Sequence, residues 1–200
     1  MLHVFYGQGG RRGGPVEMII WWGTFICMTG AGTIVFHYGI QKAKRKSLRS
    51  MKSFEKPGEE WNPKKMKKYV KHAYFVIQEC WRLLDPSYAE KYLSKSLAQS
   101  WTTKLEWMKV KHEKPIQKRV QLLSVTPVSV WDDEGEEDAS IVYLIHGRMI
   151  GYYINTDTLE VVRGKKIPES FYEYWTFIRE DGRWVLNEIQ QKDEVDVHEL

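Results

Sequence analysis

The stretch FYEYWTFIREDGRWVLNEI, residues 171–189, decides the fold. Its first part is the most aromatic segment of the chain, and Asp181-Gly182 in its middle is a dipeptide that favours a tight β-hairpin turn. We therefore predict two antiparallel strands, Phe171–Glu180 and Arg183–Ile189, joined by that turn.

Two further strands are predicted before this hairpin. The first begins at Val120 and is interrupted near Pro127, because proline cannot donate a backbone hydrogen bond to a neighbouring strand. The second, Ile141–Ile154, is apolar on both faces and contains two glycines, which indicate bends or bulges in a curved sheet. The acidic residues 132–138 between these strands are expected to form a solvated loop.

Two long helices are predicted upstream of the strands. Asn62 can cap the first helix and Pro63 suits its first turn, and apolar residues then recur at intervals of three or four over about 22 residues. Ser94 can cap the second helix, which ends before Pro115. Helices followed by antiparallel strands are typical of an α+β domain. We predict that residues 63–191 form a cone-shaped domain of long helices packed on a curved antiparallel sheet.

The composition excludes several classes of protein. Cys27 and Cys80 are too few and too far apart for a disulfide scaffold, a cysteine zinc site or a CxxC redox motif. No metalloprotease, phosphate-loop, GxSxG or nucleotide-binding motif occurs, so we expect neither a metal nor a cofactor. The net charge is +4, but residues 1–52 carry eight basic residues and one acidic residue while the remainder is mildly acidic, which excludes a uniformly basic nucleic-acid binder.

The N-terminal part contains a run of residues without charged side chains, Met18–Gln41. As a helix this run would be about 36 Å long, which exceeds the roughly 30 Å of a bilayer's hydrocarbon layer. We predict a transmembrane helix over residues 17–41, after a disordered glycine-rich leader at residues 1–16. A buried soluble helix and a cleaved signal peptide are the alternatives.

Positive charge is concentrated directly after this run. The positive-inside rule therefore places the C-terminal domain in the cytoplasm, with the N-terminus outside a bacterial inner membrane. The matrix side of the inner mitochondrial membrane is the alternative. Residues 42–62 are expected to be a basic juxtamembrane segment and hinge, and residues 192–200 an acidic tail.

Two groups of basic residues are candidate contacts for anionic lipid or for a protein partner. The alternative for each group is a solvated face. The lysines of the second group crowd the positive end of a helix dipole, where acidic residues are preferred, which favours an anionic partner. The first basic cluster is Lys42, Lys44, Arg45, Lys46 and Arg49, and the second basic cluster is Lys64, Lys65, Lys67, Lys68 and Lys71.

The C-terminal hairpin resembles the closing hairpin of the domain family named for the forty-four-kilodalton subunit of the mitochondrial inner-membrane translocase. The resemblance covers about residues 64–191. It implies a fold of the nuclear-transport-factor-two superfamily with an apolar pocket, on the inner face of a membrane, where the domain contacts anionic lipid and recruits or tethers other proteins. The residues that carry it are Phe171–Phe177, Arg179, Asp181-Gly182, Trp184 and Leu186, with Tyr92-Leu93-Ser94 before the second helix.

The resemblance and the aromatic content together suggest residues that line such a pocket, although core packing is the alternative for each of them. The superfamily also includes isomerases and dehydratases, which place an acid or base in the pocket. The candidate lining residues are Trp81, Tyr143, His146, Trp175, Phe177 and Trp184. The candidate acids and bases are His72, Asp85, His146, Glu173 and Glu188, with Tyr143 or Tyr174 as an oxyanion donor.

We therefore expect a membrane-anchored, non-enzymatic module without catalytic residues, which contacts anionic lipid and recruits an unidentified protein partner. Protein translocation is the setting that the resemblance implies. The alternatives are a scaffold subunit of a secretion complex, a small-molecule isomerase or dehydratase, and a tether for a ribosome or RNA.

Overall fold

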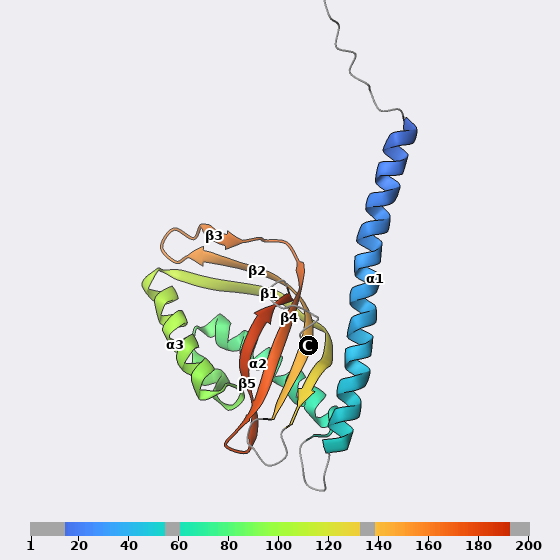
Figure 1. The fold of residues 1–200 in the computed structure, drawn as a ribbon. Coiled ribbons are helices and arrows are strands. Elements are labelled where there is room, and N and C mark those ends of the chain that lie inside the picture. The colour runs from blue at the N-terminus through green and yellow to red at the C-terminus, as the bar shows by residue number, and fades with distance from the viewer. Residues whose placement is uncertain (1–14, 55–60, 133–138, 193–200) are drawn as a thin grey trace, which may run out of the picture. The chain divides into compact units, whose positions relative to one another are not determined.

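The structure is a computed structural model that describes residues 15–54, 61–132 and 139–192, with the backbone alone for residues 15–31 (Figure 1). The chain divides into two compact units, Met1–Ile40 and Gln41–Leu200. Most of the predicted leader, the centre of the predicted hinge, the acidic loop and nearly all of the predicted tail lie outside the described residues.

Helix α1 (Pro15–Phe54) is one continuous helix of 40 residues. It includes the apolar run and continues through the residues that the sequence assigns to a basic segment. Among the described residues, no helix combines the length and the apolar character that crossing a membrane requires.

The last turns of α1 belong to the second unit and pack on its core. Ser47 and Met51 lie one turn apart on the same face and both are buried, with Met51 0% exposed. The Phe54 ring lies 5.2 Å from the Trp61 ring, which lies 5.0 Å from the Trp184 ring. Residues 41–54 are therefore a docked helix end, where the charge pattern indicated a solvated segment.

Helix α2 (Pro63–Leu83) begins where the sequence predicts. The Asn62 side chain accepts hydrogen bonds from the backbone N–H groups of Lys64 and Lys65 at 3.0 and 3.1 Å, which satisfies two donors that a first turn leaves without partners. The face of α2 that packs on the sheet carries Met66, Val70, Ala73, Tyr74, Ile77 and Cys80.

A short 3-10 helix η1 (Pro86–Tyr92) and helix α3 (Lys95–Val110) follow α2. Asp85 caps η1 and Ser94 caps α3, each by accepting a hydrogen bond from a backbone N–H of the first turn. The Ser94 N–H donates to the Leu186 carbonyl oxygen at 2.8 Å, which fixes the start of α3 against the last strand. The buried residues of α3 are Trp101, Leu105 and Met108.

The strands form one antiparallel sheet, paired in the order β1-β2-β4-β5, with the short strand β3 paired to the end of β2. Asp181 and Gly182 at the β4–β5 turn both have left-handed φ, at 51° and 74°, as a two-residue hairpin turn of this kind requires. The bounds are β1 Glu113–Trp131, β2 Ser140–Asn155, β3 Val161–Gly164, β4 Glu169–Glu180 and β5 Arg183–Gln191.

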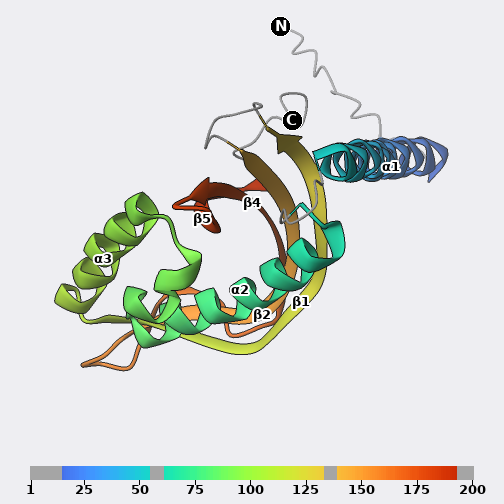
Figure 2. The same cartoon turned by 90° about the horizontal axis from the view of Figure 1, so that it is seen from below.

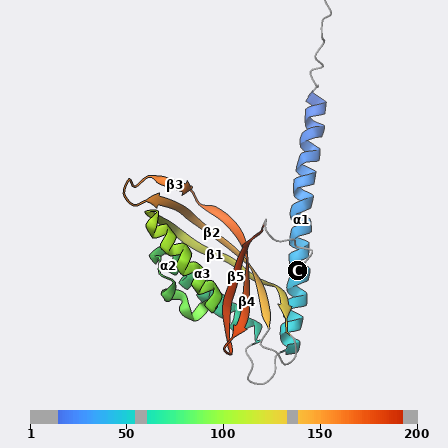
Figure 3. The ribbon, with the colours of Figure 1, turned by 60° about the vertical axis from the view of Figure 1, so that its left-hand side comes forward.

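The α+β prediction is confirmed, with helices packed on an antiparallel sheet. Figure 2 shows α2 lying on the concave side of the curved sheet, and Figure 3 shows the same packing from the side. We call the sheet face that α2 covers the inner face and the opposite one the outer face. The inner face supplies Val125, Ile141, Tyr143, Ile145, Trp175, Phe177 and Leu186 to the core.

Two parts of the sheet differ from the prediction. Strand β1 begins at Glu113 and includes Pro115, which an edge strand tolerates because one side of its backbone needs no partner. Strand β3 lies in a segment that the sequence presents as turns. The prediction of a bulge near the strand glycines is confirmed at Gly147, because the β1–β2 pairing shifts register between Leu122, its partner, and Ser124. The Phe171 ring covers Gly147, and an added Cβ would lie 2.3 Å from a ring carbon.

The thiol of Cys80 is sealed in the core beneath α2. Its side chain is fully buried and forms no disulfide. Burial, with a smaller contribution from the charge of Asp85, raises the pKa of this thiol to about 11. The reactive thiolate is therefore scarce at neutral pH, and Cys80 is a packing residue.

Candidate functional site

The second basic cluster lies on the solvent side of the first turns of α2. All five lysines are exposed, while Met66 and Val70 on the opposite side of the helix are buried. None of the five forms an ion pair with another described residue, and the first turn contains no acidic residue. The cluster is therefore a positive surface, at the positive end of a helix dipole, that no described residue neutralises.

The first basic cluster lies on the docked end of α1. Its side chains are exposed except for Lys44, which is half-buried, and none is paired with an acid among the described residues. The ring contact of Phe54 with Trp61 joins the end of α1 to the residue before the α2 cap. About 20 Å of helix lies between Gln41 and this junction, at 1.5 Å per residue.

This length of helix separates the end of the apolar run from the start of α2 more than the sequence indicates. A short hinge was expected to hold the start of α2 close to the end of the apolar run. Instead, the first cluster follows the apolar run directly, while the second begins beyond a further 14 helical residues, 41–54. The two clusters are therefore suited to different contacts.

Four of the six candidate pocket-lining residues lie in the packed core. Tyr143, Trp175, Phe177 and Trp184 are each at most 3% exposed. The Phe177 ring lies 6.0 Å from that of Tyr143 and 6.4 Å from that of Trp175. Trp81 is half-buried at the edge of the core, where its ring lies 5.0 Å from that of Trp101.

His146 lies on the outer face of the sheet, apart from the other five candidates. Side chains alternate along β2, so the neighbours Ile145 and Gly147 face inward and His146 does not. Its ring stacks on that of Tyr172, with centroids 4.1 Å apart and an angle of 12°. Burial lowers the pKa of His146, because partial desolvation disfavours the charged imidazolium.

Glu173 is the candidate acid that does face inward. One carboxylate oxygen accepts a hydrogen bond from Trp175 Nε1 at 2.9 Å, and the other accepts from Gln191 Nε2 at 3.0 Å. Burial raises the pKa of Tyr74, and the nearby charge of Glu173 raises it further. Tyr74 and Gln191 were not identified from the sequence, because neither lies near Glu173 in the chain.

The interface between α2 and the inner face contains buried hydroxyl groups without a partner among the described residues. The hydroxyl groups of Tyr74 and Tyr143 are buried and form no hydrogen bond with a described residue. Burial also raises the pKa of Tyr143, so both hydroxyl groups stay protonated. Glu188, the other hairpin carboxylate, lies on the exposed side of β5 opposite Thr176, and His72 and Asp85 are exposed.

A pocket of about 390 Å³ lies between the start of β4 and the end of β5. None of the six candidate lining residues contributes to it. Its lining is mixed polar and aromatic, and it is open to solvent. Within the described residues, no group of histidine, cysteine or acidic side chains could hold a metal ion. The pocket residues are Ser170, Phe171, Tyr172, Gln191 and Lys192.

Comparison with known proteins identifies one matching family. A family model described as a Tim44-like domain matches residues 46–191, which is well over half of the chain. No curated protein matches the sequence.

Two solved structures align with part of the chain. The intermembrane-space region of the chloroplast protein ARC6 aligns with a TM-score of 0.46 and 10% identity, covering 62% of this chain and 95% of that one. A protein from Xanthomonas campestris pv. campestris, described as a candidate polyketide cyclase, aligns with a TM-score of 0.30 and 12% identity, covering 61% and 91%. Both TM-scores are below 0.5.

Proposed function

Because the chain belongs to the Tim44-like domain family, we propose that it is a membrane-anchored, non-enzymatic tethering module of protein translocation. In this proposal its domain faces the cytoplasm or the mitochondrial matrix, contacts anionic lipid and recruits a protein partner. The family supports membrane association and a translocation setting. The finer assignments rest on the distribution of charge over the second unit.

The observation that carries the proposal is the pair of basic clusters, neither of which forms an ion pair within the described part of the chain, one at each side of the junction between α1 and α2. The first cluster directly follows the apolar run, so a bilayer that holds this run would meet these cations at its surface. A basic side chain near an anionic leaflet contributes about 1 kcal/mol of attraction. The second cluster, which begins beyond about 20 Å of helix counted from the end of the apolar run, is the proposed contact for an acidic surface of the partner.

The hydrogen bonds of Glu173, the inward-facing carboxylate, support a domain without catalysis. Both oxygens of Glu173 are held by hydrogen bonds from Trp175 and Gln191, which is a structural role. His146 lies on the other face of the sheet, so no acid–base pair is formed between them. This arrangement favours a binding domain over an isomerase or dehydratase.

The anchor is tested on the full chain in membranes. We expect the chain to stay in the membrane pellet after carbonate washing, because residues 17–41 are long enough to span the hydrocarbon layer. A reporter fused after Leu200 should be active on the cytoplasmic side. Release into the supernatant would contradict the anchor. A reporter active only outside would favour the secretion-complex scaffold.

The roles of the clusters are tested by neutralising five charges at a time in residues 41–200, which contain the second unit. Replacing the whole first cluster by Gln should weaken binding to anionic vesicles at least about tenfold, since each lost charge costs up to about 1 kcal/mol. Replacing the whole second cluster by Gln is the charge-matched control and should weaken it much less. Equal losses for the two variants, or equal binding of the unaltered protein to neutral vesicles, would contradict the proposal.

A further inference from the structure

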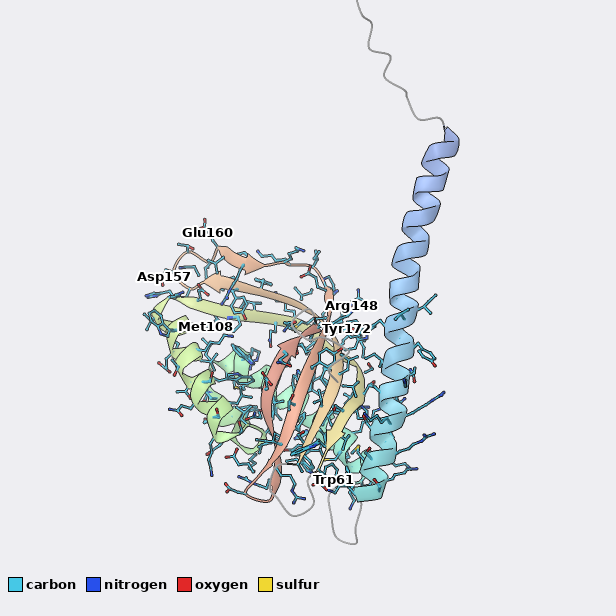
Figure 4. All side chains as sticks on the ribbon, in the orientation of Figure 1. Trp61, Met108, Arg148, Asp157, Glu160 and Tyr172 are labelled. Atoms are coloured by element: carbon cyan, nitrogen blue, oxygen red, sulfur yellow. The ribbon has the colours of Figure 1, made fainter. Side chains whose placement is uncertain are left out.

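One end of the second unit, which we call the hairpin end, is formed by the end of α3, the start of β1, the β2–β3 turn and β3. The Thr156 N–H donates to the His112 carbonyl oxygen at 2.7 Å, and the His112 ring lies 3.1 Å from the Asp157 carboxylate. Arg163 of β3 pairs with Glu113 of β1 at 3.0 Å. Figure 4 shows Met108, Asp157 and Glu160 together at this end and Trp61 at the other.

The hairpin end exposes more large apolar side chains than its own folding requires. They come from two elements that the contacts above join, the end of α3 and the β2–β3 hairpin. A cluster of exposed apolar side chains on a folded domain indicates an interaction surface. The residues and their exposed fractions are Trp107 60%, Val110 69%, Leu159 70%, Val161 38% and Val162 48%.

Leu159 is unfavourable for the isolated fold in two ways. It has a left-handed φ of 60°, which costs a non-glycine residue about 1–2 kcal/mol, and it lies at the turn where asparagine or glycine would be less strained. It is also 70% exposed, so it gains little from burial. A strained, exposed leucine at a turn indicates that its side chain has a role outside the fold.

Cations are interleaved with these apolar side chains. Lys111 Nζ lies 5.9 Å from the Trp107 ring centroid, and the Arg163 guanidinium lies 3.8 Å from that of Tyr153. Lys166 Nζ lies 5.6 Å from the ring of Tyr152. The acids at this end are largely paired, with Glu106, Glu113 and Glu169 bound to Lys109, Arg163 and Lys165, and Asp157 bound to His112. Glu160 is the exception.

We propose that the hairpin end inserts into the headgroup layer of an anionic bilayer, with Leu159, Val162 and Trp107 as the inserted side chains. Apolar side chains accompanied by lysine, arginine and tryptophan suit this layer, where tails and charged headgroups meet. The proposal rests on the proposed membrane anchor and names a second contact of the same domain.

The charge balance supports a bilayer as the occupant. Lys111 and Lys166 form no ion pair with another described residue, so the hairpin end offers positive charge beside its exposed apolar side chains. Anionic headgroups above an apolar layer are complementary to such a surface.

The test uses the full chain in vesicles of phosphatidylcholine and phosphatidylglycerol. A nitrobenzoxadiazole label is attached at Leu159→Cys, in a background where Cys27 and Cys80 are replaced by Ala. The control label is at Trp131→Cys, which is 48% exposed at the opposite end of β1. We expect brominated lipids to quench the Leu159 label about twofold, as for a side chain within the headgroup boundary, and to leave the Trp131 label unchanged.

Each other outcome overturns the inference in a recognisable way. Vesicles that carry the chain but do not quench the Leu159 label would overturn it while leaving the anchor intact. A Leu159 label shielded from iodide but not quenched by lipid would identify a protein or a second copy as the occupant. A chain that does not float with the vesicles would remove the anchor and the inference together. A label at Trp107→Cys checks that the end of α3 and the β2–β3 hairpin insert together. Brominated lipids should quench this label, and adding Val162→Asp should abolish the quenching.

Discussion

Trp175→Ala is expected to lower the free energy of unfolding by about 3–5 kcal/mol, the usual cost of emptying a large aromatic site in a core. Trp175 is 0% exposed, and its ring lies 5.6 Å from that of Tyr74 on α2. It joins the inner face of the sheet to the helix that covers it. Urea denaturation followed by far-ultraviolet circular dichroism measures the change.

Two companion variants test the hydrogen bond of Trp175 and the dependence of the loss on burial. Trp175→Phe keeps an aromatic six-membered ring in the site but removes the Nε1 hydrogen bond to Glu173, so we expect a loss of about 1–3 kcal/mol. Trp107→Ala removes a tryptophan that is 60% exposed, and we expect a change within about 0.5 kcal/mol. Similar losses for the alanine variants at Trp175 and Trp107 would contradict the packing described here.

Met51→Asp is expected to release the end of α1 from the core. A buried carboxylate without a partner costs several kcal/mol, so the helix end should leave its site before the sheet unfolds. We expect amide hydrogens of residues 41–54 to exchange at least about tenfold faster, which corresponds to about 1.4 kcal/mol or more of lost local stability. Hydrogen exchange with mass spectrometry measures this on the full chain.

Ser53→Asp is the matched control for this change. It introduces the same charge into the same last turns of α1, but at an exposed position. It should change the exchange rates only slightly, because an acid near a helix C-terminus lowers the local stability by a few tenths of a kcal/mol. If both variants accelerate exchange equally, residues 41–54 are not held by the burial of Met51.

The helix starts and the hairpin could be predicted because their signals are local. Asn62-Pro63 and Ser94 satisfy backbone donors of the turns that immediately follow them, and Asp181-Gly182 adopts the left-handed φ that its turn needs. None of these features depends on residues distant in the sequence. Their prediction therefore required no knowledge of the tertiary structure.

The docked end of α1 could not be predicted in the same way. Its charge indicates a solvated segment, and Ser47, Met51 and Phe54 are a weak apolar stripe among basic residues. Burial of this stripe depends on Trp61 and Trp184, and Trp184 lies more than 120 residues away. The start of β1 was missed for a related reason, since Pro115 reads as a break unless the strand is known to lie at an edge.

The candidate pocket residues could be predicted only in part, because a sequence pattern does not say which face of a strand is covered. The alternation of Tyr143, Ile145 and Gly147 contained the information that His146 faces the other way, but which face is covered by α2 depends on the fold. Whether an aromatic residue such as Trp175 lines a cavity or fills the core depends on the neighbours it meets. Here Tyr74 and Phe177 meet it.

The rate at which Cys80 is alkylated reports how often this domain opens. Thiol reagents need the thiolate, and this sulfur lies beneath α2 with its ionisation suppressed by burial. In a chain in which Cys27 has been replaced, the alkylation rate of Cys80 therefore measures how often α2 separates from the sheet. Any bound lipid or partner that clamps the helix would slow that rate, wherever on the domain it binds.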